Sequence, residues 1–145
     1  MILRSPLMTD VHDKETRSYN MSRIRSKNTK PELLVRRFLF GKGFRYKLHD
    51  KNLPGKPDIV FPKLKTVLFV HGCFWHGHHG CKNFVLPQTR KKWWTDKINR
   101  NKQLDVEHSI KLKQIGWKII TVFECMLKPK KRDKTLHQLV VRLLK

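Results

Sequence analysis

The chain has 145 residues, with 33 lysines and arginines against 11 acids and a formal net charge of +22. That length allows one domain with its own hydrophobic core. Because so many like charges repel one another in an isolated protein, the charge predicts a polyanionic partner. A membrane is disfavoured as that partner, since we find no long apolar span and no lipidation signal, and nucleic acid is favoured.

Residues 1–28 are polar and basic. They predict an N-terminal arm with a short helix near 17–25, and Met8 is a possible true start. Residues 29–145 are expected to form a single domain. Thr29 should cap a helix that has Glu32 in its first turn and ends near Gly41, with an apolar face of Leu34, Val35, Phe38 and Leu39.

The remaining elements are expected in the order strand, turn, strand, strand, helix, strand, helix. A short strand is predicted over 44–47 and a turn over 50–57. The apolar, β-branched runs 58–61 and 66–70 predict buried strands of a central sheet. A helix over 90–114, an alternating strand over 117–123 and an amphipathic helix over 135–144 complete the chain. Strands flanked by helices indicate an α/β or α+β domain.

The segment 71–81 holds two thiols, four imidazoles and two aromatic rings. Sulfur and nitrogen donors so close together are typical of a tetrahedral zinc site. Three cysteines without a secretory signal argue against a disulfide framework and favour a reducing cytoplasm. Four zinc ligands then require a histidine, which is either His78 or His79, beside Cys73, Cys81 and Cys125. The alternative is that the cysteines are ordinary buried small residues.

Asp58 opens a strand, where a carboxylate can hold Mg²⁺ and so neutralise charge at a phosphodiester. His76 is the candidate general base, because its unperturbed pKa of about 6.5 lies near operating pH. Asp105 is the candidate partner that orients it. His71 could contact phosphate, and Glu32 could hold water on the metal. Each acid also has an alternative interpretation without a catalytic role. Asp58 would be a turn residue, Glu32 an ordinary acid in the first turn of a helix, and Asp105 a solvated helix residue.

Two aromatic pairs lie beside basic residues. Phe74 and Trp75 stand inside the Cys/His segment, where a packing role is less natural, so we expect them to wedge between base steps. Trp94 is a further candidate for this role, and Trp93 is interpreted as core. Burial in the core is the alternative for all of them.

Several motifs resemble, in order, those of the very-short-patch mismatch repair (Vsr) endonucleases of bacteria. They cover nearly the whole chain from Met8 and lie at 10–14, 17–18, 20–21, 53–58, 71–76, 97–98, 101 and 122–125. The resemblance implies a Mg²⁺-dependent endonuclease with a restriction-endonuclease-like α/β core, a mixed sheet and a structural zinc. Members of this family nick double-stranded DNA 5′ of the thymine in a T·G mismatch, which arises when 5-methylcytosine deaminates.

The resemblance also implies roles for individual residues. Asp58 matches the metal-binding acid, with the backbone carbonyl of Val70 as a further magnesium ligand. His76 matches the catalytic histidine and Asp105 its acidic partner, while other active-site positions match Glu32 and His71. The intercalating aromatics match Phe74, Trp75 and Trp94, with Met21 on the opposite side of the DNA. The chain departs from the family pattern at four places: Val70, Leu104, Phe123 and one extra residue between His78 and Cys81.

The expected partners are mismatched DNA, a DNA cytosine methyltransferase and repair proteins. The protein is expected to be a monomer in the bacterial cytoplasm, associated with the nucleoid and not with a membrane. Two alternatives stay open: a zinc-stabilised nucleic-acid-binding module without catalysis, and a restriction-type nuclease without mismatch specificity. A pure binder would gain nothing from Asp58 in a basic groove, whereas a metal-dependent nuclease requires it.

Overall fold

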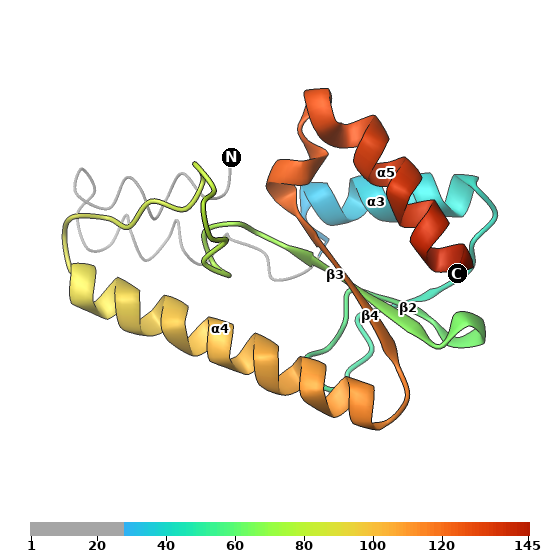
Figure 1. Ribbon diagram of the computed structural model, residues 1–145, viewed down its shortest axis with the longest axis horizontal. Helices are drawn as coiled ribbons and strands as arrows, with labels where there is room; N and C mark the ends of the chain where they lie inside the picture. The colour runs from blue at the N-terminus through green and yellow to red at the C-terminus, as the bar shows by residue number, and fades with distance from the viewer. Residues whose placement is uncertain (1–27) are drawn as a thin grey trace.

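The computed structural model describes residues 28–145 as an α/β arrangement, in which helices cover a mixed four-stranded sheet (Figure 1). Residues 1–27 of the predicted arm, including Met21, lie outside the described residues. The helices and strands are α3 (Lys30–Gly41), β1 (Lys47–Leu48), β2 (Ile59–Phe61), β3 (Thr66–His71), α4 (Lys91–Gln114), β4 (Lys118–Phe123) and α5 (Pro129–Leu144). Two 3₁₀ turns, η2 (Pro62–Leu64) and η3 (Glu124–Leu127), follow β2 and β4.

The strands lie in the order β1-β2-β3-β4. β2 is antiparallel to both β1 and β3, whereas β3 and β4 are parallel. Parallel neighbours need a crossover connection, and α4 supplies it. His71 pairs with Phe123 at the end of both strands, so the segment that leaves β3 and the segment that leaves β4 start side by side.

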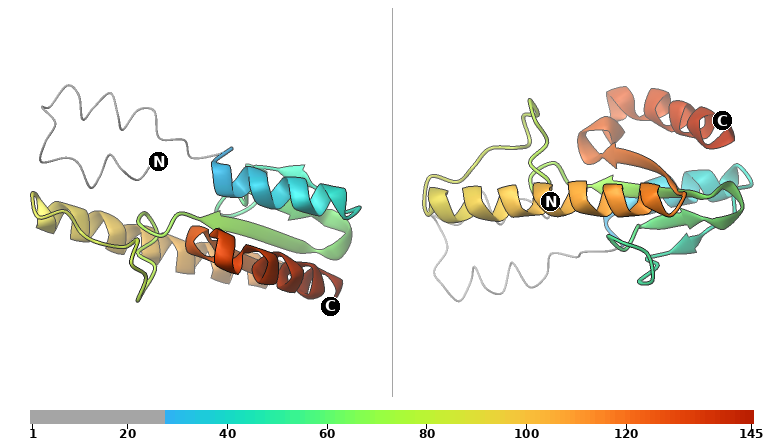
Figure 2. Two further views of the ribbon diagram at one scale, coloured as in Figure 1. Left: turned by 90° about the horizontal axis from the view of Figure 1, so that it is seen from above. Right: turned by 60° about the horizontal axis from the view of Figure 1, so that its bottom comes forward.

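Alternating side chains divide the sheet into two apolar faces. One face meets α3 and α5 through the core residues Val35, Leu39, Ile59, Phe61, Leu68, Ile120, Val122, Leu136, Leu139 and Leu143. The other face meets α4 through Val60, Val67 and Leu112, with Phe69, Trp117 and Ile119 packed against them. The views in Figures 1 and 2 agree that α3 and α5 share one side of the sheet and α4 occupies the other.

Local sequence explains where α3 begins. The Thr29 hydroxyl accepts a hydrogen bond from the Glu32 backbone N–H (3.4 Å), and Pro31 stands in the first turn, where no intrahelical N–H partner is lost. Val35 and Leu39 are fully buried. The predicted cap and apolar face are therefore confirmed, and the helix predicted over 90–114 is also observed, as Lys91–Gln114.

Two predicted elements had wrong bounds. The strand predicted over 44–47 pairs only at Lys47–Leu48, because the Phe44 and Tyr46 rings pack edge-on against Phe61 ahead of the paired residues. The final helix begins at Pro129 and not at Thr135. Proline is well suited to the first helical position, and the lysines that follow it are good helix formers.

None of the helices within residues 28–145 has the length and apolar character that a membrane span requires.

Candidate functional site

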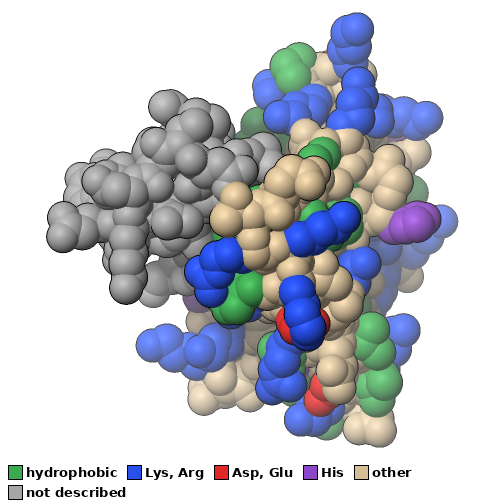
Figure 3. All heavy atoms as spheres, turned by 90° about the vertical axis from the view of Figure 1, so that its left-hand side faces the viewer, with side chains coloured by type: hydrophobic (Ala, Val, Ile, Leu, Met, Phe, Trp, Pro, Cys, Tyr) green, Lys and Arg blue, Asp and Glu red, His purple; other side chains and the backbone are tan. Residues whose placement is uncertain are grey.

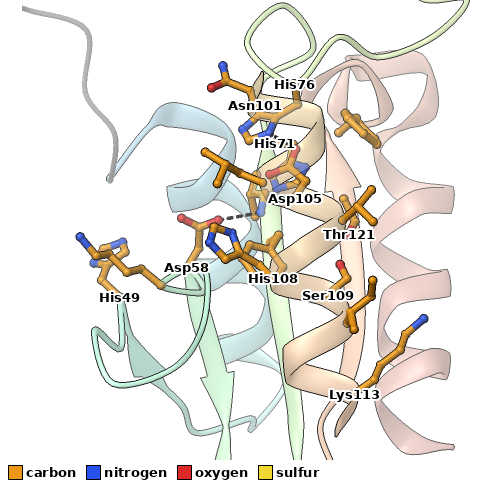
Figure 4. A pocket seen from close by; sticks show the side chains of 18 of the residues that line it. His49, Asp58, His71, His76, Asn101, Asp105, His108, Ser109, Lys113 and Thr121 are labelled. Atoms are coloured by element: carbon orange, nitrogen blue, oxygen red, sulfur yellow. Dashed lines mark hydrogen bonds and ion pairs between the residues drawn. The ribbon is translucent and has the colours of Figure 1, made fainter. Parts of the chain in front are cut away.

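A cavity of about 850 Å³ opens on the α4 side of the sheet. Its walls come from the turn before β2, the end of β3, the final residues of β4 and the middle of α4. Figure 4 shows Asp58 between His49 on one side and the cluster of His71, His76 and Asp105 on the other. Six of the lining side chains are acids or histidines: His49, Asp58, His71, His76, Asp105 and His108.

Asp58 directly precedes β2 and lies against the end of β3. The Val70 backbone N–H donates a hydrogen bond of 2.8 Å to Asp58 Oδ2. Burial raises the pKa of Asp58 from 3.8 to about 6, and the charge of Glu32 adds to that shift, while the Val70 N–H and the charges of His49 and His76 oppose it. The site therefore makes this negative charge costly unless a cation accompanies it.

Glu32 and His49 stand on one flank of Asp58. The Glu32 carboxylate is 1% exposed and has three partners: the Asn28 backbone N–H (2.9 Å), the Arg36 guanidinium (2.9 Å) and His49 Nε2 (2.7 Å). Ligand atoms of Glu32, His49 and Asp58 all lie within 4.8 Å of one another. His49 was not among the residues expected from the sequence, although a histidine at the start of the turn that leads to Asp58 was a usable signal.

His76 and Asp105 stand on the other flank. His76 Nδ1 lies 2.7 Å from Asp105 Oδ2, which leaves Nε2 free of this contact. The His71 ring stacks on the His76 ring, with centroids 3.6 Å apart and planes 3° from parallel. Burial and, to a smaller extent, the charge of His76 lower the pKa of His71 to about 4, and Asp105 partly opposes both. His71 is therefore a neutral imidazole at physiological pH.

The sequence-predicted zinc ligands also come together. Ligand atoms of Cys73, His78, Cys81 and Cys125 lie within 4.8 Å of one another, and Cys125 Sγ is 3.4 Å from His78 Nδ1. Of the two candidate histidines, His78 is in this cluster and His79 is exposed. Three thiols and one imidazole form a donor set that suits Zn²⁺, whose bonds of about 2.0–2.3 Å place its ligands at comparable separations.

The three thiols of this cluster have perturbed pKa values. Burial raises the pKa of Cys73 to about 12 and also raises that of Cys125. For Cys81, burial raises the pKa, but the Asn83 backbone N–H and the two neighbouring thiols outweigh it, so the net shift is downward. A thiolate-binding cation would therefore displace protons from Cys73 and Cys125 when it binds.

Three residues, from α4, β4 and η3, contact the Cys/His segment. The Cys73 N–H donates to Glu124 Oε1 (3.1 Å), and Asn101 Nδ2 donates to the Trp75 carbonyl (2.9 Å). The Phe123 ring stacks on His78 (3.8 Å, 4°) and meets His71 edge-on (5.6 Å, 73°). Asn101, Phe123 and Glu124 were not expected in the site from the sequence, although all three lie in the motifs that carry the family resemblance.

The candidate intercalating aromatics form one cluster. Phe74 is fully buried, Trp94 is 5% exposed, and Trp75 is partly buried against both. The Trp75 indole N–H is buried without a hydrogen-bond partner among the described residues. The interpretation of Trp93 as core is wrong: Trp93 is 44% exposed, with the Arg90 guanidinium 4.7 Å from its ring centroid. Trp94 and Ile98, one turn apart on α4, face the cluster and leave Trp93 turned toward solvent.

Comparison with known proteins gives a consistent result. The sequence model of the family "DNA mismatch endonuclease Vsr" matches residues 9–83. Over 123 residues the chain is 50% identical to the type II nicking enzyme V.NmeAIP of Neisseria meningitidis, with 85% of this chain and 87% of that protein covered. It is 49% identical over 120 residues to the type II nicking enzyme V.XorIIP of Xanthomonas oryzae (83% and 88% covered).

The chain is also 41% identical over 125 residues to the DNA mismatch endonuclease Vsr of Escherichia coli, with 86% of this chain and 80% of that protein covered. The resemblance in the sequence motifs is thus confirmed across most of the chain. The cavity adds an acid, two histidines and a carboxylate partner in one place, which is what hydrolysis of a phosphodiester uses. The chain belongs to the Vsr family of DNA mismatch endonucleases.

Proposed function

We propose that the protein nicks double-stranded DNA on the 5′ side of the thymine in a T·G mismatch. The observation that carries this proposal is the convergence of Asp58 and the His76–Asp105 pair on one cavity in a strongly basic protein. A binding module without catalysis has no use for a buried acid beside a paired histidine. Membership of the Vsr family supports the mismatch as substrate.

Asp58 and the backbone carbonyl of Val70 are the groups that would hold Mg²⁺. Carboxylate and carbonyl oxygens are its preferred protein ligands. In an antiparallel pair the N–H and C=O of one residue point toward the same neighbouring strand, and the Val70 N–H points to Asp58. When bound, Mg²⁺ supplies positive charge at the scissile phosphate.

His76 acts as the general base. Asp105 holds Nδ1, so Nε2 takes the proton from the attacking water, and the carboxylate stabilises the imidazolium that forms. His71 contacts the phosphate as a neutral hydrogen-bond donor, stacked on His76. Glu32, which already has three partners, holds His49 beside Asp58 and is the group that would bind water on the metal.

Zn²⁺ is proposed as the structural metal of Cys73, His78, Cys81 and Cys125. It would fix the segment that carries His76 to the end of β4, in a core of the restriction-endonuclease type. Phe74, Trp75 and Trp94 enter the base stack from one side and Met21 from the other. Because Phe74 is fully buried without DNA, this role requires its cluster to open when the duplex binds.

Residues 29–145 are proposed as a single endonuclease domain preceded by a basic arm. The protein works as a monomer at the bacterial nucleoid in the cytoplasm. It acts after a DNA cytosine methyltransferase, because the 5-methylcytosine made by that enzyme deaminates to give the mismatch. Repair proteins then act on the nicked DNA.

The test is nicking of a labelled duplex with one T·G mismatch beside a matched T·A duplex, each with and without Mg²⁺. A single Mg²⁺-dependent cut 5′ of the mismatched thymine, lost in Asp58→Ala with binding retained, is the expected result. Cutting of both duplexes would replace mismatch specificity with restriction-type recognition. If protein that holds zinc binds DNA without cutting it, the alternative of a nucleic-acid-binding module without catalysis would replace the proposal.

A further inference from the structure

Helix α5 carries a stripe of basic side chains along its outer surface. At 100° per residue, Lys131, Lys134, Arg142 and Lys145 share one side of the helix axis, over a length of about 21 Å. All four are exposed. We define these four residues as the α5 stripe.

Nearby acids leave the α5 stripe almost uncompensated. The acid within α5 is Asp133, and none of the ion pairs found among residues 28–145 includes a residue of α5. The adjacent helix α3 adds exposed Lys30 and Arg37, whereas its acid, Glu32, is buried. Figure 3, in which the α5 layer is uppermost and α4 lowest, shows blue side chains over both parts of this face and red only in the lower half. Apart from Asp133, the charged side chains of this layer that are exposed are therefore basic.

The opposite side of α5 is already used. Leu136, Leu139 and Leu143 are buried in the core against the sheet. A basic amphipathic helix binds a membrane by inserting its apolar face, and that face is not available here. The polar stripe alone remains, and its chemistry matches a row of phosphates.

The α5 stripe lies on the far side of the sheet from the cavity. Leu68, Ile120 and Val122 point toward α3 and α5, whereas the alternate residues Phe69, Thr121 and Phe123 line the cavity. A whole helix, about 10–12 Å in diameter, separates the stripe from the sheet. A duplex held in the cavity does not reach the α5 stripe unless it bends around the protein.

We propose that the α5 stripe binds the phosphate backbone of a second DNA segment, so that one protein molecule bridges two duplexes. The second contact is independent of sequence and keeps the enzyme on DNA while the cavity releases one segment and samples another. The inference rests on the proposed function for the duplex in the cavity. It assigns a DNA partner to the basic side chains of the α5 stripe, which lie outside the cavity.

The test compares two triple variants in an Asp58→Asn background, which prevents nicking. Lys131→Gln/Lys134→Gln/Arg142→Gln removes three charges from the stripe. The matched control, Lys42→Gln/Lys47→Gln/Lys63→Gln, removes three exposed charges elsewhere. Donor- and acceptor-labelled duplexes of about 16 base pairs are far shorter than the persistence length of about 150 base pairs, so neither can wrap around the protein.

Energy transfer between the duplexes, with sedimentation to identify one protein bound to two DNAs, measures bridging. We expect the background protein and the control to bridge two duplexes. The stripe variant should need a concentration about tenfold higher to give the same bridging. The salt dependence of the second binding step should become shallower by about 2–3 in log–log slope. Absence of bridging by the background protein, or equal loss in both triple variants, would overturn the inference. Nicking of a single T·G duplex by the same triples with Asp58 restored reports on the proposed function separately.

Discussion

At Asp58 a carboxyl group lies where its negative charge is unfavourable, and this has a measurable effect on stability. Its pKa is raised from 3.8 to about 6. A raised carboxyl pKa contributes stability that is present below pH 4 and lost as pH rises through 6. In protein without divalent cations, Asp58→Asn should therefore be more stable than the parent above pH 7, by about 3 kcal/mol, with no difference near pH 4.

Denaturant unfolding of both proteins from pH 4 to 8 measures this difference. His71, whose pKa is lowered to about 4, changes stability in the opposite sense over the same range. Its contribution is common to both proteins and cancels in the comparison. A stability difference that does not vary with pH would contradict the assignment of a raised pKa to Asp58.

The His76–Asp105 pair should act as one unit in catalysis. His76→Ala is expected to lower the single-turnover nicking rate by about 10²–10⁴, the usual contribution of a general base. Asp105→Ala should lower it less, because Asp105 acts through His76. The double variant should match His76→Ala within a few fold, since a partner has no effect once the group that it orients is gone. Multiplicative losses in the double variant would show that Asp105 has a separate role.

Side chains whose chemistry is unusual for their position were predictable from the sequence. Asp58, His76 and the three cysteines stand out because an acid, an imidazole or a thiol there has little packing value. His49 was missed because its role depends on a contact with Glu32, 17 positions earlier in the chain. No local pattern reveals such a contact. Trp93 was assigned to the wrong environment because adjacent helix positions differ by 100° and the sequence alone leaves the phase of α4 open.

At the scale of elements, the end of β4 supports the Cys/His segment through Phe123. This ring lies between His78 and His71, and His71 in turn stacks on His76. Phe123→Leu should retain zinc yet lower the nicking rate by about tenfold, because the rings that it aligned become mobile. Phe123→Trp should keep most of the activity, since an indole presents the same stacking face.

Zinc content by elemental analysis and single-turnover nicking are the two measurements for these variants. If Phe123→Leu loses zinc and activity together, the ring serves only to hold the metal site. Equal activity in all three proteins would leave the stack without a role in positioning His76.

Long elements were predicted better than short ones. The 24-residue helix α4 and the cap of α3 carry enough local signal to be found from sequence. Strand β1, with two paired residues, exists only because β2 lies beside it. Edge pairing of this kind depends on tertiary context and not on local propensity.

For the whole molecule, the Cys/His cluster joins segments that leave two different strands. Cys73 lies two residues beyond His71 and Cys125 two residues beyond Phe123, and these strand ends are paired. Removing the metal with a chelator should lower the melting temperature by about 10 °C or more, as expected for a loss of a few kcal/mol.

Calorimetry with and without chelator, beside a Cys125→Ser variant, measures this contribution. The variant should melt near the chelated parent and show no further change with chelator. An unchanged melting temperature after verified loss of metal would mean that the cluster does not stabilise the fold.

The fold class and the order of most elements followed from the sequence, whereas the assembly of the site did not. Its two flanks meet because β2 and β3 pair antiparallel, which places Asp58 against Val70, and because the crossover helix α4 brings Asp105 to His76. Register between distant strands is set by packing on both faces of the sheet, which no local window contains.

This topology also sets when the protein becomes an enzyme during its synthesis. Domains fold from the N-terminal end as the ribosome delivers them, but Phe123, Glu124 and Cys125 follow α4 and the other three strands. Until β4 emerges, the segment with His76 has neither its neighbouring strand nor Cys125, the last of the proposed zinc ligands. A nascent or truncated chain that lacks β4 can therefore be basic enough to bind DNA without being able to cut it. The chain acquires its nuclease activity only once β4 and η3 have been added.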